Sequence, residues 1–434
     1  MIIILLFTLM FLLMALGLPI ALAIGLPAIG LIVTPGVFPD TVTLAALGQT
    51  VVQQLFSGVD SFDLLAVPLF MIAGSIMEVG GISRRLIDFC DSLVGWAPGG
   101  LAAAAIVASM IIAGISGSAA ADTAAIGGVV IPAMIRQGYP PAFAAAVVAA
   151  GGSIGIIIPP SIPMVIFGFM TNISISQLFA GGMLVGILMG LSFLVIAVWV
   201  SWRNGYGERQ PFAWKKVLVT GKAAFWSMGA PIVVLGGILT GIVTVTEAAA
   251  LAVFYALLVG TVINRELPWK ELPGLIMRSQ VAAGGILFII AMAKIFGWLL
   301  AMQQTATLLD VFVNSLSLPP VGLLLLIMGL LLIVGCIMET TAALLLLVPV
   351  LALLTPQMQV DPVQFGVLVV VNLAIGMLTP PVGICLFVAC GIADVSLGKI
   401  SRAVMPLVIV AIIDLLIAAL WPPLTMWLPT LFYR

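Results

Sequence analysis

The sequences SGSAAADT, at residues 116–123, and GIIIPP, at residues 155–160, recur in altered form in the second half of the chain. The second copy reads GCIMETT at residues 335–341 and GMLTPP at residues 376–381. In each copy an acidic residue precedes a threonine, and a glycine stands four positions before a pair of prolines. Because proline lacks an N–H donor and clashes with the preceding helical turn, each pair predicts a break in an apolar helix.

The composition places these breaks in a membrane protein. The chain has 434 residues, of which 63% are hydrophobic and 7% are charged, whereas soluble domains carry about 25% charged residues. The apolar runs are long and continuous, so we expect an all-α polytopic membrane protein. The net charge of −1 does not indicate nucleic-acid binding. The chain lacks histidine, metal-binding cysteine spacing and a phosphate-binding loop, which argues against an enzyme or an ATP-driven pump.

Two long apolar stretches are interrupted by polar residues near their middles. Residues 99–132 contain the Ser-Gly-Ser sequence and Asp122, and residues 321–354 contain Glu339. A straight helix of this length would extend to about 50 Å, well beyond the roughly 30 Å hydrocarbon core of a bilayer. We therefore predict two re-entrant hairpins, each built from two half-length helices with a polar tip.

A broken helix follows each predicted hairpin, at residues 142–170 and at residues 365–395. The chain then divides into a first repeat at 1–205, a basic linker at 206–224, and a second repeat at 225–434 that has one extra helix. Helices broken at matching places in two halves indicate the binding site of a secondary transporter.

The remaining apolar stretches complete the expected order of spans. Residues 1–33 predict one long span with a kink or a tilt, because they contain two prolines. Residues 404–427 predict the last span. The stretches at 82–93 and 307–315 mix charged and apolar residues and predict helices that lie in the membrane plane.

The basic residues predict the orientation. Thirteen of the fifteen lysines and arginines fall in loops that the expected crossings place on one side, and the exceptions are Lys294 and Arg434. The opposite loops, which include 34–60 and 302–320, contain none. The basic side is expected to be cytoplasmic, with the N-terminus inside and the C-terminus outside. The hairpins then enter from opposite faces, and the repeats are inverted.

Helix ends inside a membrane leave free N–H groups and free carbonyls that protein, water or ligand must satisfy. Carbonyl and hydroxyl oxygens suit a monovalent cation, and N-terminal N–H groups suit a carboxylate. The candidate ion and substrate ligands all lie at a predicted tip or break. They are Ser116, Gly117, Ser118, Asp122, Gly152, Ser153, Gly155, Pro159, Pro160, Gly335, Glu339, Thr340, Thr341, Asn372, Gly376, Thr379, Pro380 and Pro381.

Four charged residues have alternative explanations. Asp122 and Glu339 each precede a predicted second half-helix, so each could ligate a cation or cap that helix. Lys294 and Asp414 are isolated charges within predicted spans. Each of these two could pair with another residue of the chain for stability, or could contact a partner or a substrate.

Three stretches resemble one known family. The sequence from SGSAAADT through IIIPPSIPMVIFG at 116–168, LGGILTGIVTVTEAAALAVFYALLVG at 235–260 and NLAIGMLTPPVGICLFVACGIADV at 372–395 are similar to the large membrane subunit of tripartite ATP-independent periplasmic (TRAP) transporters. The similarity extends over nearly the whole chain.

The resemblance implies a fold of the ion-transporter superfamily and an elevator-type carrier in the bacterial inner membrane. It implies sodium-driven uptake of an organic acid, typically a C4-dicarboxylate or sialic acid, with sodium ions at the tips and breaks and no other cofactor. The implied partners are a small four-helix membrane subunit and a periplasmic binding protein. A stand-alone sodium–anion symporter of the same superfamily is the alternative.

Overall fold

The computed structural model describes residues 2–34, 43–207 and 211–433, and all regular structure within these ranges is helical. In chain order the α-helices are α1 (Ile2–Ala15), α2 (Ile20–Ile32), α3 (Leu44–Ser57), α4 (Ala66–Val79), α5 (Ile82–Val94), α6 (Gly100–Ser116), α7 (Ala119–Arg136), α8 (Pro141–Ser153), α9 (Ile162–Thr171), α10 (Ile175–Asn204), α11 (Trp214–Leu239), α12 (Val245–Leu257), α13 (Leu272–Met302), α14 (Thr305–Ser315), α15 (Pro320–Ile337), α16 (Thr340–Met358), α17 (Pro362–Gly376), α18 (Ile384–Ala393), α19 (Leu397–Leu420) and α20 (Pro423–Phe432). Two short 3-10 segments, η1 (Asp63–Leu65) and η2 (Ile154–Ile156), and one π-helical segment, η3 (Leu258–Ile263), complete the set.

Within the described residues, eight helices are long and apolar enough to cross a membrane. They are α7, α10, α11, α12 with η3, α13, α15, α16 and α19. The pair of α4 and α5 passes the same test only together, and it is bent by 64°. These helices confirm the expected polytopic all-α class.

The chain breaks where the sequence predicts the first hairpin tip and the first broken helix, but α7 has 18 residues and is long enough to cross a membrane, so it is not the half-length helix expected. Helix α6 ends at Ser116 and is followed by Gly117, whose φ of +65° lies in the left-handed region that glycine tolerates, and α7 begins two residues after Gly117. Helix α8 continues into η2 and stops, and the chain runs without regular hydrogen bonding past the proline pair until α9 begins. The proline-pair peptide bond Pro159–Pro160 is cis.

The second hairpin and break repeat this arrangement. Helices α15 and α16 are separated only by Met338 and Glu339, and Glu339 is the N-cap residue of α16. Helix α17 ends at Gly376, and α18 begins after Gly383, whose φ is +53°. The peptide bond Pro380–Pro381 is also cis.

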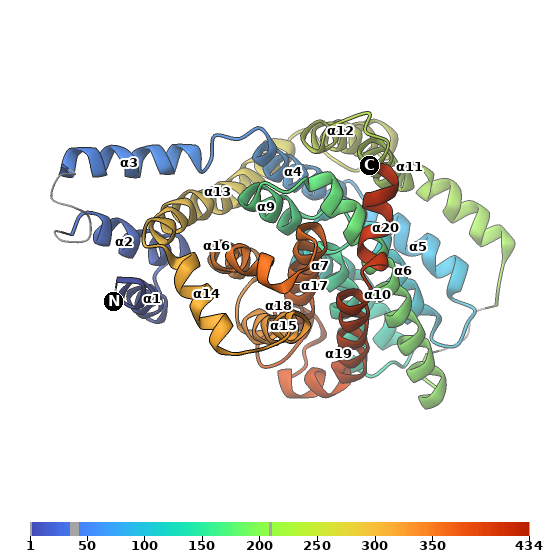
Figure 1. The fold of residues 1–434 in the computed structure, drawn as a ribbon. Coiled ribbons are helices and arrows are strands. Elements are labelled where there is room, and N and C mark those ends of the chain that lie inside the picture. The colour runs from blue at the N-terminus through green and yellow to red at the C-terminus, as the bar shows by residue number, and fades with distance from the viewer. Residues whose placement is uncertain (1, 35–42, 208–210, 434) are drawn as a thin grey trace.

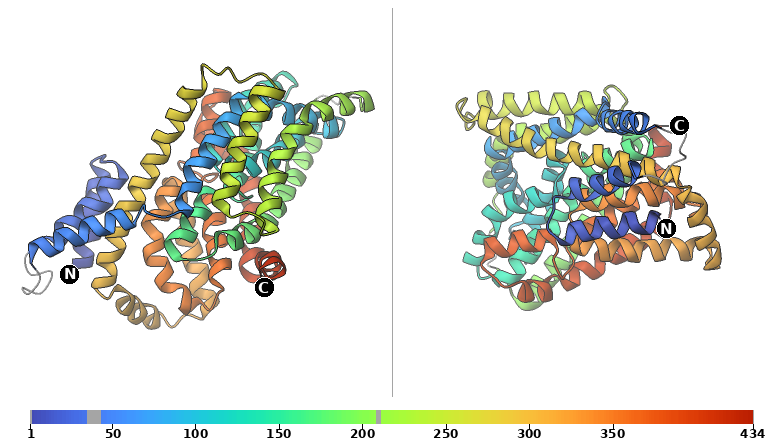
Figure 2. Two further views of the ribbon diagram at one scale, coloured as in Figure 1. Left: turned by 90° about the horizontal axis from the view of Figure 1, so that it is seen from above. Right: turned by 90° about the vertical axis from the view of Figure 1, so that its left-hand side faces the viewer.

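The two hairpin-and-break units interlock at the centre of the molecule. Helix α18 packs against α7 and α8 of the first unit, and α16 packs against α9. Helices α7 and α15 to α18 accordingly gather in the middle of Figure 1. The long helix α13 runs past this centre and, with α4, forms a wall beside it (Figure 2).

The N-terminal segment differs from the sequence prediction. Residues 1–33 were expected to form one span, but α1 and α2 are separate helices that pack against each other and, through α2, against α13. The break contains Gly17, with φ of +83°, and Pro19, which precedes the first residue of α2. Figure 1 shows these helices, with α3, at one end of the molecule.

Two other boundaries also differ. Helix α11 begins at Trp214, so much of the predicted linker at 206–224 is helical. The last span is α19, which ends at Leu420 before the prolines at 422–423, and α20 follows as a separate helix. Part of the predicted loop at 34–60, together with Arg209 and Arg434, lies outside the described residues.

Candidate functional site

Both hairpin tips open on one cavity of about 380 Å³. The first tip contributes Ser116, Gly117, Ser118 and Asp122, and the second contributes Glu339 and Thr341. The opposite wall consists of side chains from α4 and α13. They include Met71, Ser75 and Glu78 of α4 and Ala282, Ile286 and Ile289 of α13. The cavity therefore lies between the interlocked centre and the wall.

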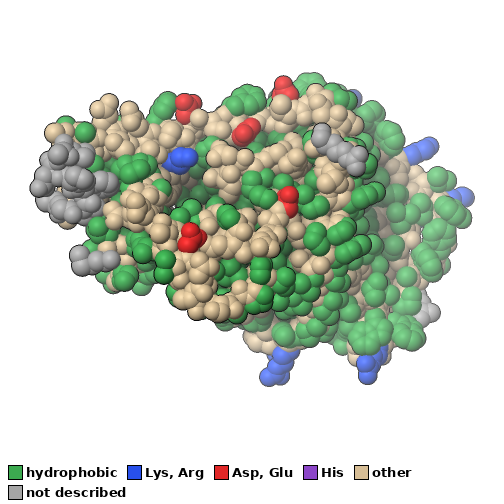
Figure 3. Space-filling view, viewed as in Figure 1, with side chains coloured by type: hydrophobic (Ala, Val, Ile, Leu, Met, Phe, Trp, Pro, Cys, Tyr) green, Lys and Arg blue, Asp and Glu red, His purple; other side chains and the backbone are tan. Residues whose placement is uncertain are grey.

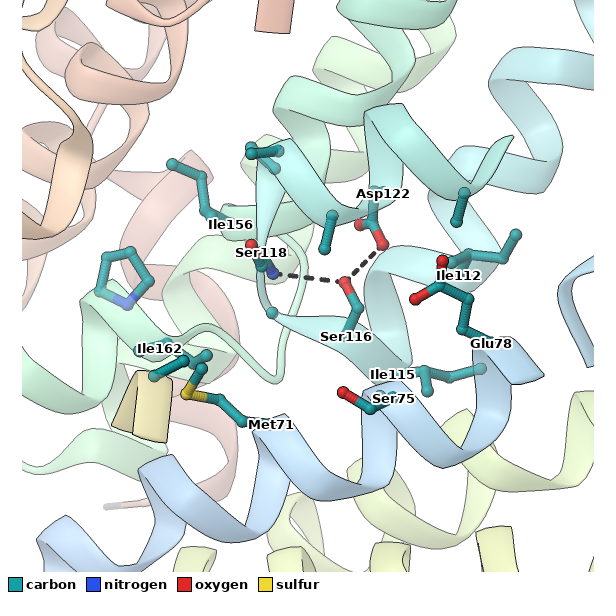
Figure 4. A pocket seen from close by; sticks show the side chains of 18 of the residues that line it. Met71, Ser75, Glu78, Ile112, Ile115, Ser116, Ser118, Asp122, Ile156 and Ile162 are labelled. Atoms are coloured by element: carbon teal, nitrogen blue, oxygen red, sulfur yellow. Dashed lines mark hydrogen bonds between the residues drawn. The ribbon is translucent and has the colours of Figure 1, made fainter. Parts of the chain in front are cut away.

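The first tip is closed by hydrogen bonds around the Ser116 hydroxyl. Ser116 Oγ donates to Asp122 Oδ1 at 2.5 Å and accepts from the backbone N–H of Ser118 at 3.2 Å. Figure 4 shows these bonds, with Glu78 of α4 extending toward the same serine. The left-handed turn at Gly117 makes this geometry possible, because it brings the end of α6 back toward the first turns of α7.

Asp122 keeps one oxygen without a hydrogen-bond partner. Its side chain is 1% exposed, and Oδ2 bonds to none of the described residues. Gly155 lies directly beside it, since a Cβ at Gly155 would stand 2.1 Å from this oxygen. A buried oxygen without a partner usually costs about 1–3 kcal/mol, which a bound cation would offset. Asp122 is not the N-cap residue of α7, and its second oxygen stays available to a ligand.

Glu339 instead caps a helix. Its carboxylate accepts from the backbone N–H of Ala342 at 3.0 Å and from Thr341 Oγ1 at 2.9 Å. Glu339 is the N-cap residue, whereas Asp122 is the fourth residue of α7 and Ser118 holds the N-cap position. The two acids occupy matching positions in the repeated sequence. Relative to the start of its own helix, however, Asp122 lies about one turn further along than Glu339.

Glycines allow each tip to touch its neighbouring break. At the first tip, a Cβ at Gly117 would meet the carbonyl oxygen of Pro160 at 2.8 Å. At the second, a Cβ at Gly376 would lie 2.5 Å from the backbone of Gly335. The backbone N–H of Gly383 also donates to the carbonyl of Cys336 at 3.2 Å. Each tip and break thus form one packed unit of backbone.

The other predicted residues do not line this cavity; most are buried, but Thr379 and Pro380 are half-buried and Pro381 is exposed. They are Gly152, Ser153, Gly155, Pro159, Pro160, Gly335, Thr340, Asn372, Gly376, Thr379, Pro380 and Pro381. Asn372 is fully buried and donates through Nδ2 to the Met328 carbonyl at 2.8 Å, and its Oδ1 has no partner among the described residues. Thr379 donates to the Ile375 carbonyl at 2.7 Å, and Thr340 contacts the Met377 sulfur at 2.8 Å.

Sequence reasoning missed Ser161 and the wall. Ser161 is fully buried, donates to the Ile156 carbonyl and accepts from the Met164 N–H, so it caps α9. A serine just before Ile-Pro is a recognisable N-cap signal. Glu78 is a charge near the end of an apolar helix and could have been suspected on that ground. The apolar wall residues of α13 carry no such signal.

The two isolated charges, Asp414 and Lys294, have different surroundings in the structure. Asp414 is buried and accepts from Ser192 Oγ at 3.1 Å through Oδ1, while its Oδ2 has no partner among the described residues, so its expected pairing is met at one oxygen only. In the described part of the chain, ion pairs join Arg85 to Glu266 and Lys216 to Asp91, and neither includes Lys294. The expected internal pairing of Lys294 is therefore not found.

The cavity combines carboxyl groups with hydroxyls and backbone. Glu78, Asp122 and Glu339 line it, and none of its described lining residues is a lysine or arginine. Across the described ranges no group of three or more His, Cys, Asp or Glu residues is placed to hold a metal ion. Dispersed oxygens of this kind suit a weakly bound hard cation better than a transition metal.

The comparisons with known proteins identify the family. The family model described as "Tripartite ATP-independent periplasmic transporter, DctM component" matches residues 7–424. The chain belongs to this family. It is thus the large permease subunit of a TRAP transporter, one component of a tripartite system, and its relatives are transporter subunits and not enzymes.

Two curated relatives illustrate the family. The C4-dicarboxylate TRAP transporter large permease protein DctM of Pseudomonas aeruginosa is 37% identical over 90% of each chain. The isethionate TRAP transporter permease protein DctMQ of Oleidesulfovibrio alaskensis is 40% identical over 95% of this chain. This chain spans only 64% of that relative's length.

A solved structure supports the fold. The YdaH transporter of Alcanivorax borkumensis superposes with a TM-score of 0.65, covering 88% of this chain and 90% of that one. At 15% identity this likeness concerns the fold alone.

Proposed function

We propose that this TRAP permease subunit carries out sodium-driven uptake of a small organic anion in the bacterial inner membrane. A periplasmic binding protein would deliver the anion, and a small membrane subunit would complete the permease. The observation that carries the proposal is the convergence of two hairpin tips, each bearing a carboxyl group, on one cavity. Broken helices beside a shared cavity are typical of secondary transporters.

Sodium is the ion that the tips suit best. Each tip-and-break unit contains one buried oxygen without a partner, Asp122 Oδ2 in the first and Asn372 Oδ1 in the second. Each unit also brings glycine backbone close to a carbonyl, as at Gly117 and Pro160. Neutral and carboxylate oxygens in this arrangement support two sodium sites, one for each unit.

The charge pattern supports inverted halves and a cytoplasmic basic side. The face in Figure 3 carries scattered acidic side chains, and the basic side chains visible there lie mainly at its rim. We assign this face to the periplasm by the positive-inside rule. The interlocked centre would then move against the wall of α4 and α13 as an elevator, carrying the tips from one side to the other.

The substrate class follows from family members and from charge. Isethionate and C4-dicarboxylates, named for two relatives, are both small organic anions. Because the cavity lining presents carboxyl groups and no basic side chain, a bound anion would need cations from solution beside it. Sialic acid and other carboxylates meet the same requirement.

Uptake in proteoliposomes tests the proposal. The reconstituted permease with its binding protein should accumulate radiolabelled succinate, isethionate or sialic acid under an inward sodium gradient, and ATP should have no effect. Uptake driven at full rate by a proton gradient alone would refute sodium coupling. Full uptake without the binding protein would favour the stand-alone symporter.

A further inference from the structure

Lys294 is an isolated cation on the wall helix α13. It is the only lysine or arginine between residues 279 and 398, and its side chain is exposed between buried Ala293 and Ile295. Among the described residues no carboxylate lies within ion-pair distance and no hydrogen bond to its amine is formed. A lysine in apolar surroundings usually has a partner, because an unpaired charge there is costly.

A second cavity, of about 300 Å³, surrounds Lys294. Gln54 of α3 and Trp298 of α13 line it on one side, and Met170 of α9 and Pro349 of α16 line it on the other. The end of α3 packs over the lysine, since a Cβ at Gly58 would lie 3.1 Å from Lys294 Cβ. The cavity thus separates the wall from the interlocked centre.

The second cavity lies next to the central cavity along α13. Ile286 and Ile289 line the central cavity, and Ile290 and Lys294 line the next one. At 1.5 Å per residue, the five positions from Ile289 to Lys294 span only about 7.5 Å of helix. In the assigned orientation this end of α13 faces the periplasm. An anion beside Lys294 would therefore stand one to two helical turns along α13 from Ile289, a residue of the central cavity, on the side from which substrate arrives.

We propose that the Lys294 cavity is an outer anion site that receives the carboxylate or sulfonate group of the substrate before it reaches the tips. This inference rests on the proposed function. The charges are complementary, since the only charged side chains among the described lining residues of the central cavity are carboxyl groups, while this neighbouring cavity offers one unpaired ammonium. Lys294 is a specificity-determining residue for anions and has no role in sodium binding.

Trp298 permits a direct test that needs no transport. Iodide, an anionic quencher, should quench the part of the fluorescence that is lost in Trp298→Phe, and succinate or isethionate should compete. In Lys294→Gln the iodide quenching of this part should fall severalfold, while quenching by neutral acrylamide should not change. Equal iodide quenching in both proteins would overturn the proposal, whatever the outcome of the uptake assays.

Uptake kinetics test whether the site lies on the transport route. With the anion that wild-type vesicles accumulate, Lys294→Gln should raise KM about tenfold, equivalent to about 1.4 kcal/mol, with kcat and the sodium half-saturation unchanged. Lys294→Arg should restore KM. Lys270→Gln removes the same charge before α13 begins, outside both cavities, and should have no effect. Iodide binding without a KM effect would refute the role in transport.

Two further experiments test whether Lys294 binds an anion other than the substrate. The phosphate group of a lipid could also bind the Lys294 ammonium, so the KM effect of Lys294→Gln is compared in vesicles with and without phosphatidylglycerol. An effect confined to vesicles containing that lipid would overturn the proposal. Docking of the unliganded binding protein to permease in nanodiscs should be equal for wild type and Lys294→Gln, and weaker docking would assign Lys294 to that interface instead. Failure of wild-type uptake would refute the proposed function separately.

Discussion

Replacement of Gly376 by alanine should displace the second tip from its break. The new Cβ would lie 2.5 Å from the backbone of Gly335, about 0.9 Å short of the 3.4 Å at which ordinary contacts begin. Both partners are backbone, so no side chain can rotate away. Overpacking of this kind typically destabilises a protein by about 1–3 kcal/mol. Alanine favours a helix over glycine by about 1 kcal/mol in a helix interior, and this gain is smaller at the end of α17.

The expected result is a loss of sodium-dependent uptake by at least tenfold in proteoliposomes, at equal amounts of inserted protein. Gly335→Ala should be milder, because its Cβ would stand 3.1 Å from Gly376 Cα. Gly329→Ala, on the exposed side of α15 with nothing within 4 Å, should transport like wild type. Wild-type transport by Gly376→Ala, or a larger loss in Gly329→Ala, would refute the close backbone approach.

Three further predictions concern the tips and the topology. Ser116→Ala and Asp122→Asn should be non-additive in the sodium half-saturation by about 0.5–3 kcal/mol, because one hydrogen bond joins these residues; additivity in a double-mutant cycle would contradict this. Glu339→Ala should lower the thermal-unfolding midpoint of the solubilised protein, since loss of an N-cap costs about 0.5–2 kcal/mol, and an unchanged midpoint would argue against the cap. A cysteine at exposed Ser315 should react with an impermeant reagent from outside and one at exposed Gly398 only from inside; the reverse pattern would exclude the assigned orientation.

The hairpins and breaks could be predicted from the sequence because strong local signals mark them. Ser116-Gly-Ser and Met338-Glu339 interrupt apolar runs, and the proline pairs cannot continue a helix. Helices α6 and α7 accordingly fall within about four residues of the predicted hairpin at 99–132. The prolines in residues 1–33 predict a kink within one span, whereas Gly17 and Pro19 separate two helices.

The remaining features depend on tertiary structure. The matching spacing of Asp122 and Glu339 suggested equivalent roles, but Gly117 turns left-handed while Met338 is extended, so the two second arms begin at different positions relative to their acids. The wall of α4 and α13 could not be predicted from the sequence for another reason. Ile286 and Ile289 have the same apolar character whether they face lipid or a cavity, and only the fold places them opposite the tips.

The central cavity presents Glu78, Asp122 and Glu339 without a basic side chain among its described lining residues. In a sodium-coupled carrier this makes the two ligands thermodynamically linked. If saturating sodium raises substrate affinity tenfold, a coupling free energy of about 1.4 kcal/mol, then saturating substrate must raise sodium affinity by the same factor. The anion alone would be held weakly, because only bound sodium offsets the carboxyl groups. The substrate would therefore leave a sodium-free cavity before the cavity moved, and transport of the anion without sodium would be kept small by electrostatics.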